Sequence, residues 1–254
     1  MSRADPHSSL LTPTETISFL QRAPIFAGLS EADLQALGKD FRHREFAKEE
    51  VLFRQGDESR DLYVVFKGKV RIFKISPAGH ETSLNIFSAG GIIGEFALLD
   101  GEPRSATAVA LGRCSVWQMA ADTFLSHLRS KPELALQTAR LLAKKLRWTA
   151  AYAEAVAQYD AAGRLLHILL LYNEQFGEEL EPGKRYALDL SLNQTDLASL
   201  VGARREWVNR LLREWERRGL LQYEDGKLTI FDLPRMREER DWRIEADGGD
   251  TATP

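Results

Sequence analysis

The sequence of 254 residues contains a single cysteine and no long apolar stretch. Cys114 cannot form an internal disulfide, and one thiolate cannot by itself hold an iron–sulfur cluster or a structural zinc ion. No window approaches the roughly 20 consecutive apolar residues of a membrane-spanning helix, and the polar amino terminus has no apolar core of a signal peptide. We therefore expect a cytoplasmic protein that has no membrane partner and no iron–sulfur cluster.

An excess of positive charge is also missing, because 34 Lys and Arg residues stand against 37 Asp and Glu residues, for a formal net charge of −3. The protein as a whole therefore does not attract a polyanion. Any surface that binds nucleic acid must be local.

The sequence also lacks the patterns of metal sites and of common catalytic sites. Its five histidines are scattered and do not have the spacing of metal ligands. A G-x-S-x-G elbow is missing, and residues 177–184 do not complete a P-loop because Arg185 stands where Ser or Thr binds magnesium. We expect no metal and no enzymatic activity.

The amino-terminal half has the texture of a β-rich domain. From about residue 41 to 120, short runs of β-branched and aromatic residues alternate with glycines, which predicts a β-roll or barrel after a short helical lead-in. We expect this domain over residues 14–131. Residues 1–13 and 235–254 are polar, cannot repay the entropy of ordering by burial, and are expected to be disordered tails.

A long helix is predicted to follow this domain. Between Pro132 and Gly163 the sequence contains neither proline nor glycine, so one helix of about 28 residues is expected. It is too long for one small domain to cover, and its apolar residues recur at coiled-coil steps. We interpret residues 132–160 as a helix that makes a homodimer and ends in a hinge; the alternative is a helix packed on its own domain. The recurring residues are Leu141, Trp148, Tyr152, Val156 and Tyr159.

The last part of the chain, residues 161–234, has the order of a winged helix-turn-helix. Asn193 or Ser191 can cap a short helix, and Gly202 can form the turn that follows it. Asp225-Gly226 between two β-prone runs is typical of a two-residue hairpin, the wing. The fold class expected for the whole chain is α+β.

The second helix of this motif, which we expect to start near Ala203, carries a concentrated positive charge. Residues 203–219 contain six Arg and three Glu, a formal charge of +3. Arginine can donate two hydrogen bonds to guanine, and Glu can accept one from cytosine, so Arg205, Glu206 and Arg210 can read G·C pairs from one helix face. A solvated surface helix with ion pairs is the alternative. The capped first helix, the turn and the wing favour binding to double-stranded DNA.

Residues 92–110, IIGEFALLDGEPRSATAVA, have the chemistry of a site for a small phosphate. Arg104 offers a positive charge, the turn after Gly94 offers backbone N–H groups, and Ser105 offers a hydroxyl. Glu95 would repel a phosphate unless it paired with Arg104 or accepted a sugar hydroxyl, which points to a cyclic ribose phosphate with a free 2′-hydroxyl. An ordinary ion pair at a β-turn is the alternative.

The segment GEFALLDGEPRSATA resembles the phosphate-binding cassette of cyclic-nucleotide-binding domains. With the long helix and the spacing Arg205-Glu206-x-x-x-Arg210, the chain resembles bacterial transcription regulators of the cyclic AMP receptor/FNR (Crp/Fnr) family over about residues 25–233. The resemblance implies a cyclic-nucleotide-binding β-roll, a long dimerisation helix and a winged helix-turn-helix. It also implies cyclic AMP as the effector and RNA polymerase as a partner.

The resemblance assigns roles to individual residues. It implies that Gly94 and Glu95 meet the ribose, that Arg104 and Ser105 hold the cyclic phosphate, and that Thr149 reaches the adenine. Ala150 departs from the Ser that cyclic AMP receptors of the family have at this position. On the DNA side, it implies half-sites like TGTGA. The residues expected at the DNA are Arg205, Glu206, Arg210, Asn193, Gln194, Arg204 and Asn209.

Several alternatives stay open at this stage. Ala150 keeps open a family member that senses another ligand, such as a cyclic dinucleotide or 2-oxoglutarate, or that binds DNA without an effector. A haem sensor would need an axial ligand, for which His80 is the only candidate, and we expect no haem. A regulatory subunit that never touches DNA and a purely structural β module are the remaining alternatives.

Overall fold

The computed structural model describes residues 13–79, 81–190 and 192–244, so His80, Ser191 and most of the two expected tails lie outside the described residues. The chain divides into two compact units, Met1–Lys144 and Lys145–Pro254. The first unit contains helices α1 (Pro13–Arg22), η1 (Pro24–Phe26), α2 (Glu31–Asp40), α3 (Glu95–Asp100) and α4 (Ala121–Ser130), and strands β1 (Arg42–Phe46), β2 (Val51–Phe53), β3 (Leu62–Lys67), β4 (Val70–Ile75), β5 (Glu81–Phe87), β6 (Ile92–Ile93), β7 (Thr107–Ala110) and β8 (Cys114–Met119).

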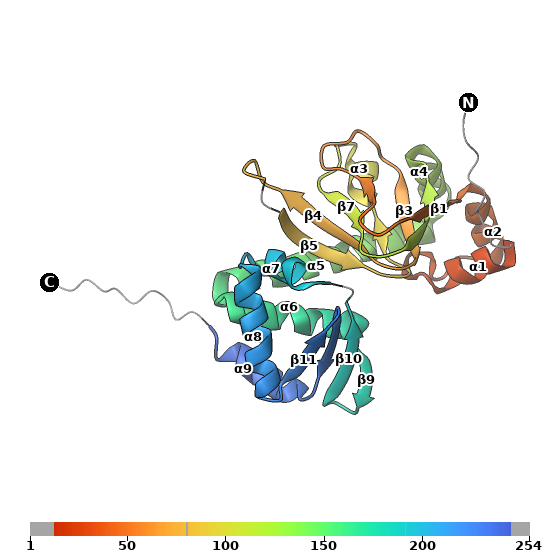
Figure 1. The fold of residues 1–254 in the computed structure, drawn as a ribbon. Helices are drawn as coiled ribbons and strands as arrows, with labels where there is room; N and C mark the ends of the chain where they lie inside the picture. Colours follow the sequence, from red (N-terminus) through yellow and green to blue (C-terminus); the bar gives the residue numbers. More distant parts are fainter. Residues whose placement is uncertain (1–12, 80, 191, 245–254) are drawn as a thin grey trace. The chain divides into compact units, whose positions relative to one another are not determined.

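The strands of the first unit form two antiparallel sheets, with the orders β1-β8-β3-β6 and β2-β7-β4-β5 (Figure 1). Strand β3 is buried on both sides. Tyr63 and Val65 belong to the core between the sheets, while Leu62 and Val64 belong to a second core with residues of α1, α2 and α4. Successive side chains of a strand point to opposite faces, so the part of β3 that lies between the two cores, residues 62–65, is apolar at each position. The predicted β-roll with a helical lead-in is confirmed.

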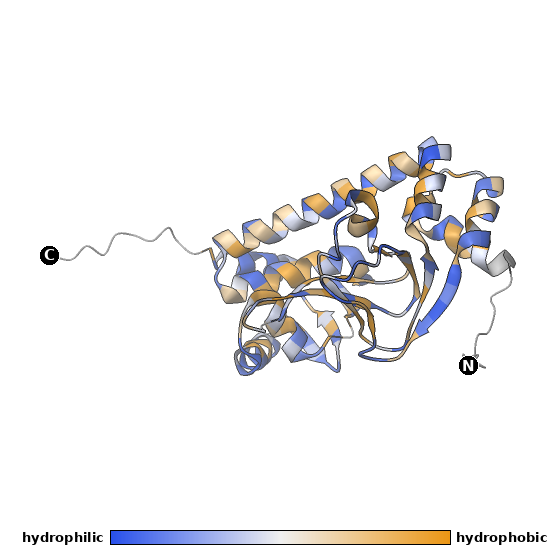
Figure 2. Cartoon of the chain, turned by 90° about the horizontal axis from the view of Figure 1, so that it is seen from above, coloured by the Kyte–Doolittle hydropathy of each residue, from blue (hydrophilic) through white to orange (hydrophobic). Residues whose placement is uncertain are grey.

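The predicted long helix is α5 (Pro132–Gln158), which has 27 residues and carries apolar and polar positions along its whole length (Figure 2). The division between the two compact units falls inside this helix, at Lys144. The reason is that its first turns pack on the first unit, where Leu134 is fully buried and Leu141 touches the same core.

The predicted seam of the long helix needs correction at Tyr152 and Tyr159. The hydroxyl of Tyr152 donates to the carbonyl of Leu200 at 2.9 Å, and Tyr159 is only 8% exposed. Both side chains therefore pack within the second unit of their own chain. The large apolar side chains that α5 exposes in this unit are Leu146, at 70%, and Val156, at 50%.

The second unit has the elements of a winged helix-turn-helix, as predicted. A four-stranded antiparallel sheet has the order β11-β12-β10-β9. Asp225 and Gly226 both have positive φ, 49° and 81°, and form the expected two-residue turn of the wing. The elements after α5 are α6 (Ala161–Phe176), β9 (Glu178–Glu181), β10 (Arg185–Asp189), α7 (Gln194–Val201), α8 (Arg205–Arg217), β11 (Leu221–Glu224), β12 (Lys227–Ile230) and α9 (Leu233–Asp241).

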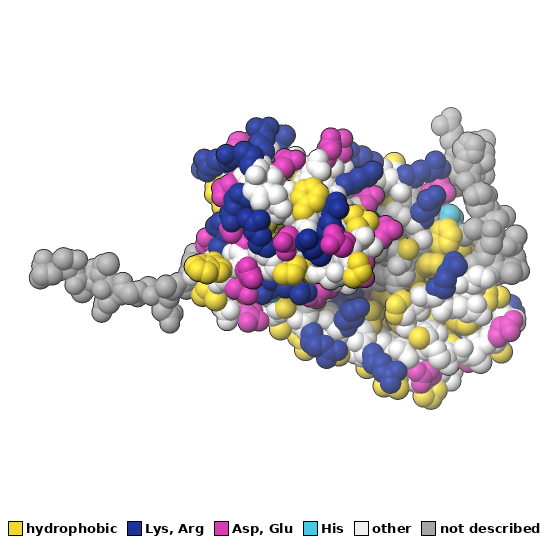
Figure 3. Space-filling model, turned by 90° about the horizontal axis from the view of Figure 1, so that it is seen from below, with side chains coloured by type: hydrophobic (Ala, Val, Ile, Leu, Met, Phe, Trp, Pro, Cys, Tyr) yellow, Lys and Arg dark blue, Asp and Glu magenta, His cyan; other side chains and the backbone are white. Residues whose placement is uncertain are grey.

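The surface charge agrees with the nearly balanced composition. On the face shown in Figure 3, Lys and Arg side chains are interleaved with Asp and Glu side chains.

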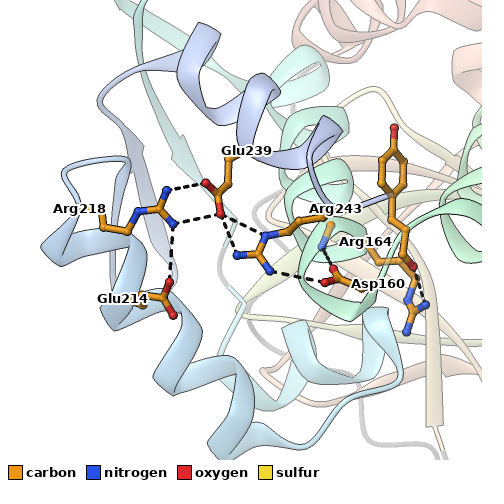
Figure 4. Close-up of polar contacts among 8 residues, drawn as sticks. Asp160, Arg164, Glu214, Arg218, Glu239 and Arg243 are labelled. Atoms are coloured by element: carbon orange, nitrogen blue, oxygen red, sulfur yellow. Dashed lines mark hydrogen bonds and ion pairs between the residues drawn. The ribbon is translucent and has the colours of Figure 1, made fainter. Parts of the chain in front are cut away.

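The expectation of a tail from residue 235 is wrong for residues 235–244. Helix α9 (Leu233–Asp241) buries Leu233 and Met236. Its Glu239 accepts hydrogen bonds from Arg218 at 3.0 and 2.5 Å and from Arg243 at 2.8 and 3.1 Å (Figure 4). One bidentate ion pair, two further hydrogen bonds from Arg243 and two buried side chains offset the entropy lost by ordering this charged segment.

Acid should weaken the second unit through Glu239. Hydrogen bonds from Arg218 and Arg243 lower the pKa of Glu239 from its usual 4.5 to about 2. A carboxylate whose pKa is depressed by folding stabilises the folded state above its unfolded pKa, and this contribution is lost as the pH falls through the folded pKa. Glu239 is 16% exposed, and we expect it to contribute about 1–2 kcal/mol.

The measurement is urea unfolding of the wild type and of Glu239→Gln at several pH values. The difference between their free energies of unfolding should be largest near pH 5 and should decrease toward about pH 2.5. Glu238→Gln is the matched control, since it makes the same charge change at the exposed neighbouring position. A Glu239 difference that does not change over this range contradicts the prediction.

Candidate effector site and DNA interface

Arg104 lies at the centre of the predicted phosphate cassette and is only 2% exposed. Its Nη1 donates to the carbonyl of Gly94 at 2.9 Å, its Nη2 to the carbonyl of Asp61 at 2.7 Å, and its Nε to the hydroxyl of Ser59 at 3.2 Å. The guanidinium carbon lies 4.1 Å from the ring centre of Phe53. These partners are neutral groups, so they orient the guanidinium without cancelling its charge.

The electrostatics of Arg104 favour an anionic ligand. Burial lowers its pKa, and the nearby Tyr63, Asp61, Asp57 and Glu95 act against this shift. An arginine nevertheless stays protonated in a protein, so burial appears as an energetic cost of its charge. A phosphate that contacted the guanidinium would offset this cost.

Two of the predicted ligand residues, Gly94 and Glu95, lie close to this guanidinium. Gly94 is the N-cap of α3 and Glu95, 3% exposed, is its first residue. The backbone of Arg104 is paired with the Gly56–Asp57 turn by hydrogen bonds of 2.8 and 2.9 Å. Ser105 follows Arg104 in the chain and is exposed. The cassette therefore combines one buried cation, one buried acid and one accessible hydroxyl.

Thr149 is not part of this group in the first unit. It lies on α5 in the second unit, is exposed, and its hydroxyl donates to the carbonyl of Lys145 at 3.0 Å. Ala150 is exposed beside it. The role of Thr149 toward a base stays a prediction.

Sequence reasoning missed the groups that hold Arg104. Ser59 and Asp61 are 45 and 43 residues away from it in the chain, and Asp61 acts through its backbone carbonyl. The side-chain pattern of a sequence carries no information about which carbonyl a distant arginine meets.

Gly94 gives a first test of this geometry. It has φ +88°, and a Cβ built there would lie 2.4 Å from Nη1 of Arg104 and 2.7 Å from the carbonyl oxygen of Asp61. We expect Gly94→Ala to displace Arg104, to destabilise the first unit by about 1–3 kcal/mol and to weaken effector binding. Thermal unfolding and ligand titration measure the two effects.

Gly79→Ala is the matched control for this substitution. Gly79 has φ +81°, and a Cβ there meets nothing within 4 Å. The backbone strain is therefore similar, while the collision is absent. If both variants lost equal stability and bound the effector like the wild type, close packing of Gly94 on Arg104 would be unimportant.

The helix-turn-helix is built by local interactions that the sequence predicted. The side chain of Asn193 accepts from the N–H groups of Thr195 and Asp196 and so caps α7. Gly202, at φ 67°, ends this helix in the left-handed conformation. Helix α8 begins at Arg205 with Arg204 as N-cap, two residues later than the expected start at Ala203.

Helix α8 separates its apolar and its charged side chains. Val208, Leu211, Leu212 and Trp215 are buried. Because this side packs on its own unit, the opposite side faces solvent. Of the predicted DNA-reading residues, Asn209 and Gln194 are partly exposed, and the others are exposed: Asn193, Arg204, Arg205, Glu206 and Arg210.

Comparison with known proteins assigns a domain family to each unit. The sequence model of the cyclic nucleotide-binding domain matches residues 43–131, and that of the Crp-like helix-turn-helix domain matches residues 163–239. The CRP-like cAMP-activated global transcriptional regulator of Mycobacterium tuberculosis is 31% identical over 217 residues, which are 85% of this chain and 96% of the relative. The chain belongs to the Crp/Fnr family.

A second relative and two solved structures extend this comparison. The cyclic AMP receptor protein of Thermus thermophilus is 28% identical over 86% of this chain and 97% of its own length. A CooA mutant from Carboxydothermus hydrogenoformans has the same fold, with a TM-score of 0.68 at 22% identity over 84% of this chain and 92% of CooA. The regulator CLP of Xanthomonas campestris also shares it, with a TM-score of 0.65 at 21% identity over 80% and 100% of the two chains.

Family membership decides the class of this Crp/Fnr protein. It is a DNA-binding transcriptional regulator with a cyclic nucleotide-binding domain, and its relatives are regulators rather than enzymes. None of the helices in residues 13–79, 81–190 and 192–244 combines the length and hydrophobicity that crossing a membrane requires. The same ranges contain no cluster of three or more His, Cys, Asp or Glu residues that could hold a metal ion.

Proposed function

We propose that this regulator is gated by cyclic AMP, bound at the cassette of the first unit. The observation that carries the proposal is Arg104, a cation that is 2% exposed and oriented by neutral acceptors. A cyclic phosphate supplies the single negative charge that such a group lacks among these acceptors. Ser105 adds a hydroxyl donor at the accessible edge of the same turn.

Glu95 supports a ribose beside the phosphate. It is 3% exposed and close enough to Arg104 to act on its pKa. A buried carboxylate repels a phosphate but accepts a hydrogen bond from a hydroxyl, and a cyclic nucleotide offers a free 2′-hydroxyl. The named relatives agree, since one is described as cAMP-activated and another as a cyclic AMP receptor protein.

The base end of the ligand is where a second candidate arises. Thr149 offers one hydroxyl toward an adenine, but Ala150 offers none. This change favours, as the second candidate, a regulator of the same build that senses another ligand, such as a cyclic dinucleotide or 2-oxoglutarate, or that binds DNA without an effector.

On the DNA side we propose a homodimer that binds a palindrome with half-sites like TGTGA. Two copies of α8 would enter successive major grooves, where Arg205 and Arg210 read guanine and Glu206 reads cytosine. Effector binding would favour one arrangement of the paired α5 helices and so set the spacing of the two α8 helices. We further propose that the protein acts in the cytoplasm on chromosomal DNA and contacts RNA polymerase there.

The proposed dimer predicts a large effect of one exposed residue. Leu146 is 70% exposed within its own chain, so its replacement removes little of the protomer's own packing. In a seam along α5, a lysine there would bring two like charges into an apolar contact. We expect Leu146→Lys to shift the protein from dimer to monomer in sedimentation at micromolar concentration with an unchanged circular dichroism spectrum.

Lys144→Gln is the control for Leu146→Lys. It changes a charge on the opposite side of the same helix, two residues away, where the side chain is also exposed. This variant should stay dimeric. A Leu146→Lys protein that sediments as the wild type does would place the seam elsewhere.

The proposed function is tested by calorimetric titration with cyclic AMP and, alongside, cyclic GMP. A fluorescein-labelled duplex with two TGTGA half-sites is then titrated with and without cyclic AMP, and fluorescence anisotropy is followed. Binding of cyclic AMP together with tighter DNA binding supports the proposal. Lack of heat with both nucleotides, with DNA binding retained, would replace it by the second candidate.

A further inference from the structure

The break between the long helix α5 and helix α6 is paired with the end of the chain. Tyr159 forms an antiparallel bridge with Ile244, and the N–H of Asp160 donates to the carbonyl of Arg243 at 3.1 Å. The ion pair between Arg243 and the Asp160 carboxylate measures 3.5 Å. The segment after α9 therefore contacts the backbone of Tyr159 and Asp160 and the side chain of Asp160.

The packing at this break is close. One carboxylate oxygen of Asp160 accepts from the N–H of Gly163 at 2.7 Å and caps α6, and the other oxygen faces Arg243. A Cβ on Gly163 would lie 2.9 Å from the Cβ of Arg243 and 2.9 Å from that of Tyr159. The first turn of α6 thus tolerates no larger residue where the end of the chain crosses it.

The same segment is connected to the DNA-reading helix. Arg218, the C-cap of α8, makes a bidentate pair with Glu239, and Glu239 also accepts two hydrogen bonds from Arg243 (Figure 4). A further pair of 3.6 Å joins Arg218 to Glu214 on α8 itself. A continuous row of charged contacts therefore leads from the helix break, through Arg243 and Glu239, to the end of α8.

This row differs from an ordinary surface ion pair. Its central side chains, Glu239 and Arg243, are 16% and 24% exposed. Bidentate geometry and partial burial make such pairs stronger and more directional than single exposed pairs. The Crp-like helix-turn-helix domain matches residues 163–239. The two segments that meet at the break, residues 159–162 and 240–244, lie outside this range.

We propose that Glu239 and Arg243 are positioning residues of DNA recognition, which fix α8 relative to the break between α5 and α6. Glu239 lies on α9 and Arg243 follows this helix, so neither residue belongs to α8 itself. A displacement of the break moves Asp160, and with it Arg243, Glu239 and Arg218. Insofar as this displacement is driven by an effector, the inference rests on the proposed function; the coupling between the break and α8 does not.

The test is a double-mutant cycle on two residues that the network of Figure 4 joins only through Arg243 and Glu239. Asp160→Asn keeps a side chain that caps α6 but removes the charge facing Arg243. Arg218→Gln removes the bidentate pair with Glu239. The affinity of the full chain for the labelled TGTGA duplex is measured for both single variants and the double variant.

The proposal predicts that the effect of the double variant differs at least about threefold from the product of the two single effects. In a Glu239→Gln background the two effects should multiply to within about twofold. In the matched Glu238→Gln background, the double variant should still deviate at least about threefold from the product of the single effects. If Glu239 had only a structural role, Glu239→Gln would lower stability but would leave the coupling between Asp160 and Arg218 in place. Effects that multiply in the wild-type background as well would overturn the proposal.

A second readout separates this proposal from the proposed DNA sequence. Amide hydrogen exchange of Arg205–Arg217 is followed by mass spectrometry for the same variants without DNA. Asp160→Asn should raise the exchange rate of the last turn of α8 about threefold or more, and this effect should vanish in Glu239→Gln but not in Glu238→Gln. If the protein shows this pattern of exchange rates but does not bind the TGTGA duplex, only the proposed half-site is rejected. Absence of the pattern would reject the proposal.

Discussion

Replacement of Arg104 by Gln is expected to weaken the binding of cyclic AMP by about 30-fold or more. The glutamine side chain removes the positive charge from a position that is 2% exposed. A phosphate would then enter a buried place without its counter-charge, which is the main cost of truncating a buried charged pair. Calorimetric titration measures the loss directly.

Arg113→Gln is the control for Arg104→Gln, because it makes the same charge change in the same unit. Arg113 is 82% exposed and pairs with Glu45 at 3.1 Å on the surface. We expect this variant to bind cyclic AMP within about twofold of the wild type. Equal affinities of all three proteins would show that Arg104 does not hold the effector.

The stability of Arg104→Gln must be measured beside its affinity. The carbonyls of Gly94 and Asp61 and the hydroxyl of Ser59 lose hydrogen-bond donors in this variant. Ser59 is exposed, so water can replace its lost donor, whereas a carbonyl that stays shielded from water without a donor costs about 1–3 kcal/mol. Titration at a temperature where urea unfolding finds the variant folded separates a lost ligand contact from a lost fold.

Replacement of Arg205 by Gln is expected to weaken binding to the TGTGA duplex and to relax its sequence preference. Arg205 is the first residue of α8 and is exposed on its charged side. An arginine that donates two hydrogen bonds to guanine supplies about 1–3 kcal/mol of discrimination, which corresponds to about 5- to 150-fold in affinity. Anisotropy with duplexes that carry G·C or A·T at the contacted pair measures both effects.

Arg217→Gln distinguishes base reading from general attraction. Arg217 is an exposed arginine of the last turn of α8, so the charge of the helix changes equally in the two variants. If Arg217 contacts a phosphate, its loss should weaken binding to all duplexes by the same factor and reduce the salt dependence of binding. If Arg205→Gln also weakened all duplexes alike, this residue would not read a base.

The parts of the fold that were predicted correctly depend on residues close together in the chain. Asn193 caps α7 through N–H groups two and three residues away, and Gly202 ends the same helix. Asp225 and Gly226 form the wing turn by their own positive φ angles. Such interactions are available in any short peptide of this sequence, and a reader can therefore recognise them without the rest of the molecule.

The errors came from contacts between distant segments. Tyr152 was assigned to the seam of α5 from helical spacing, but its hydroxyl donates to the carbonyl of Leu200, 48 residues away. The expected tail was read from its charge, but Glu239 meets Arg218, 21 residues before it. Spacing and composition indicate that a side chain is apolar or charged; they do not indicate which distant partner it finds.

The amino-acid sequence by itself determined the α+β class, the order of β-roll, long helix and winged helix-turn-helix, and the residue types of both sites. These follow from periodicity, turns and motifs, which act over a few residues. Only the tertiary structure decided that Arg104 is buried against Gly94, Asp61 and Ser59, and that the end of the chain holds the break after α5. The physical reason is that a buried charge takes its partners from whatever segments the folded core brings beside it, and those segments are distant in the chain.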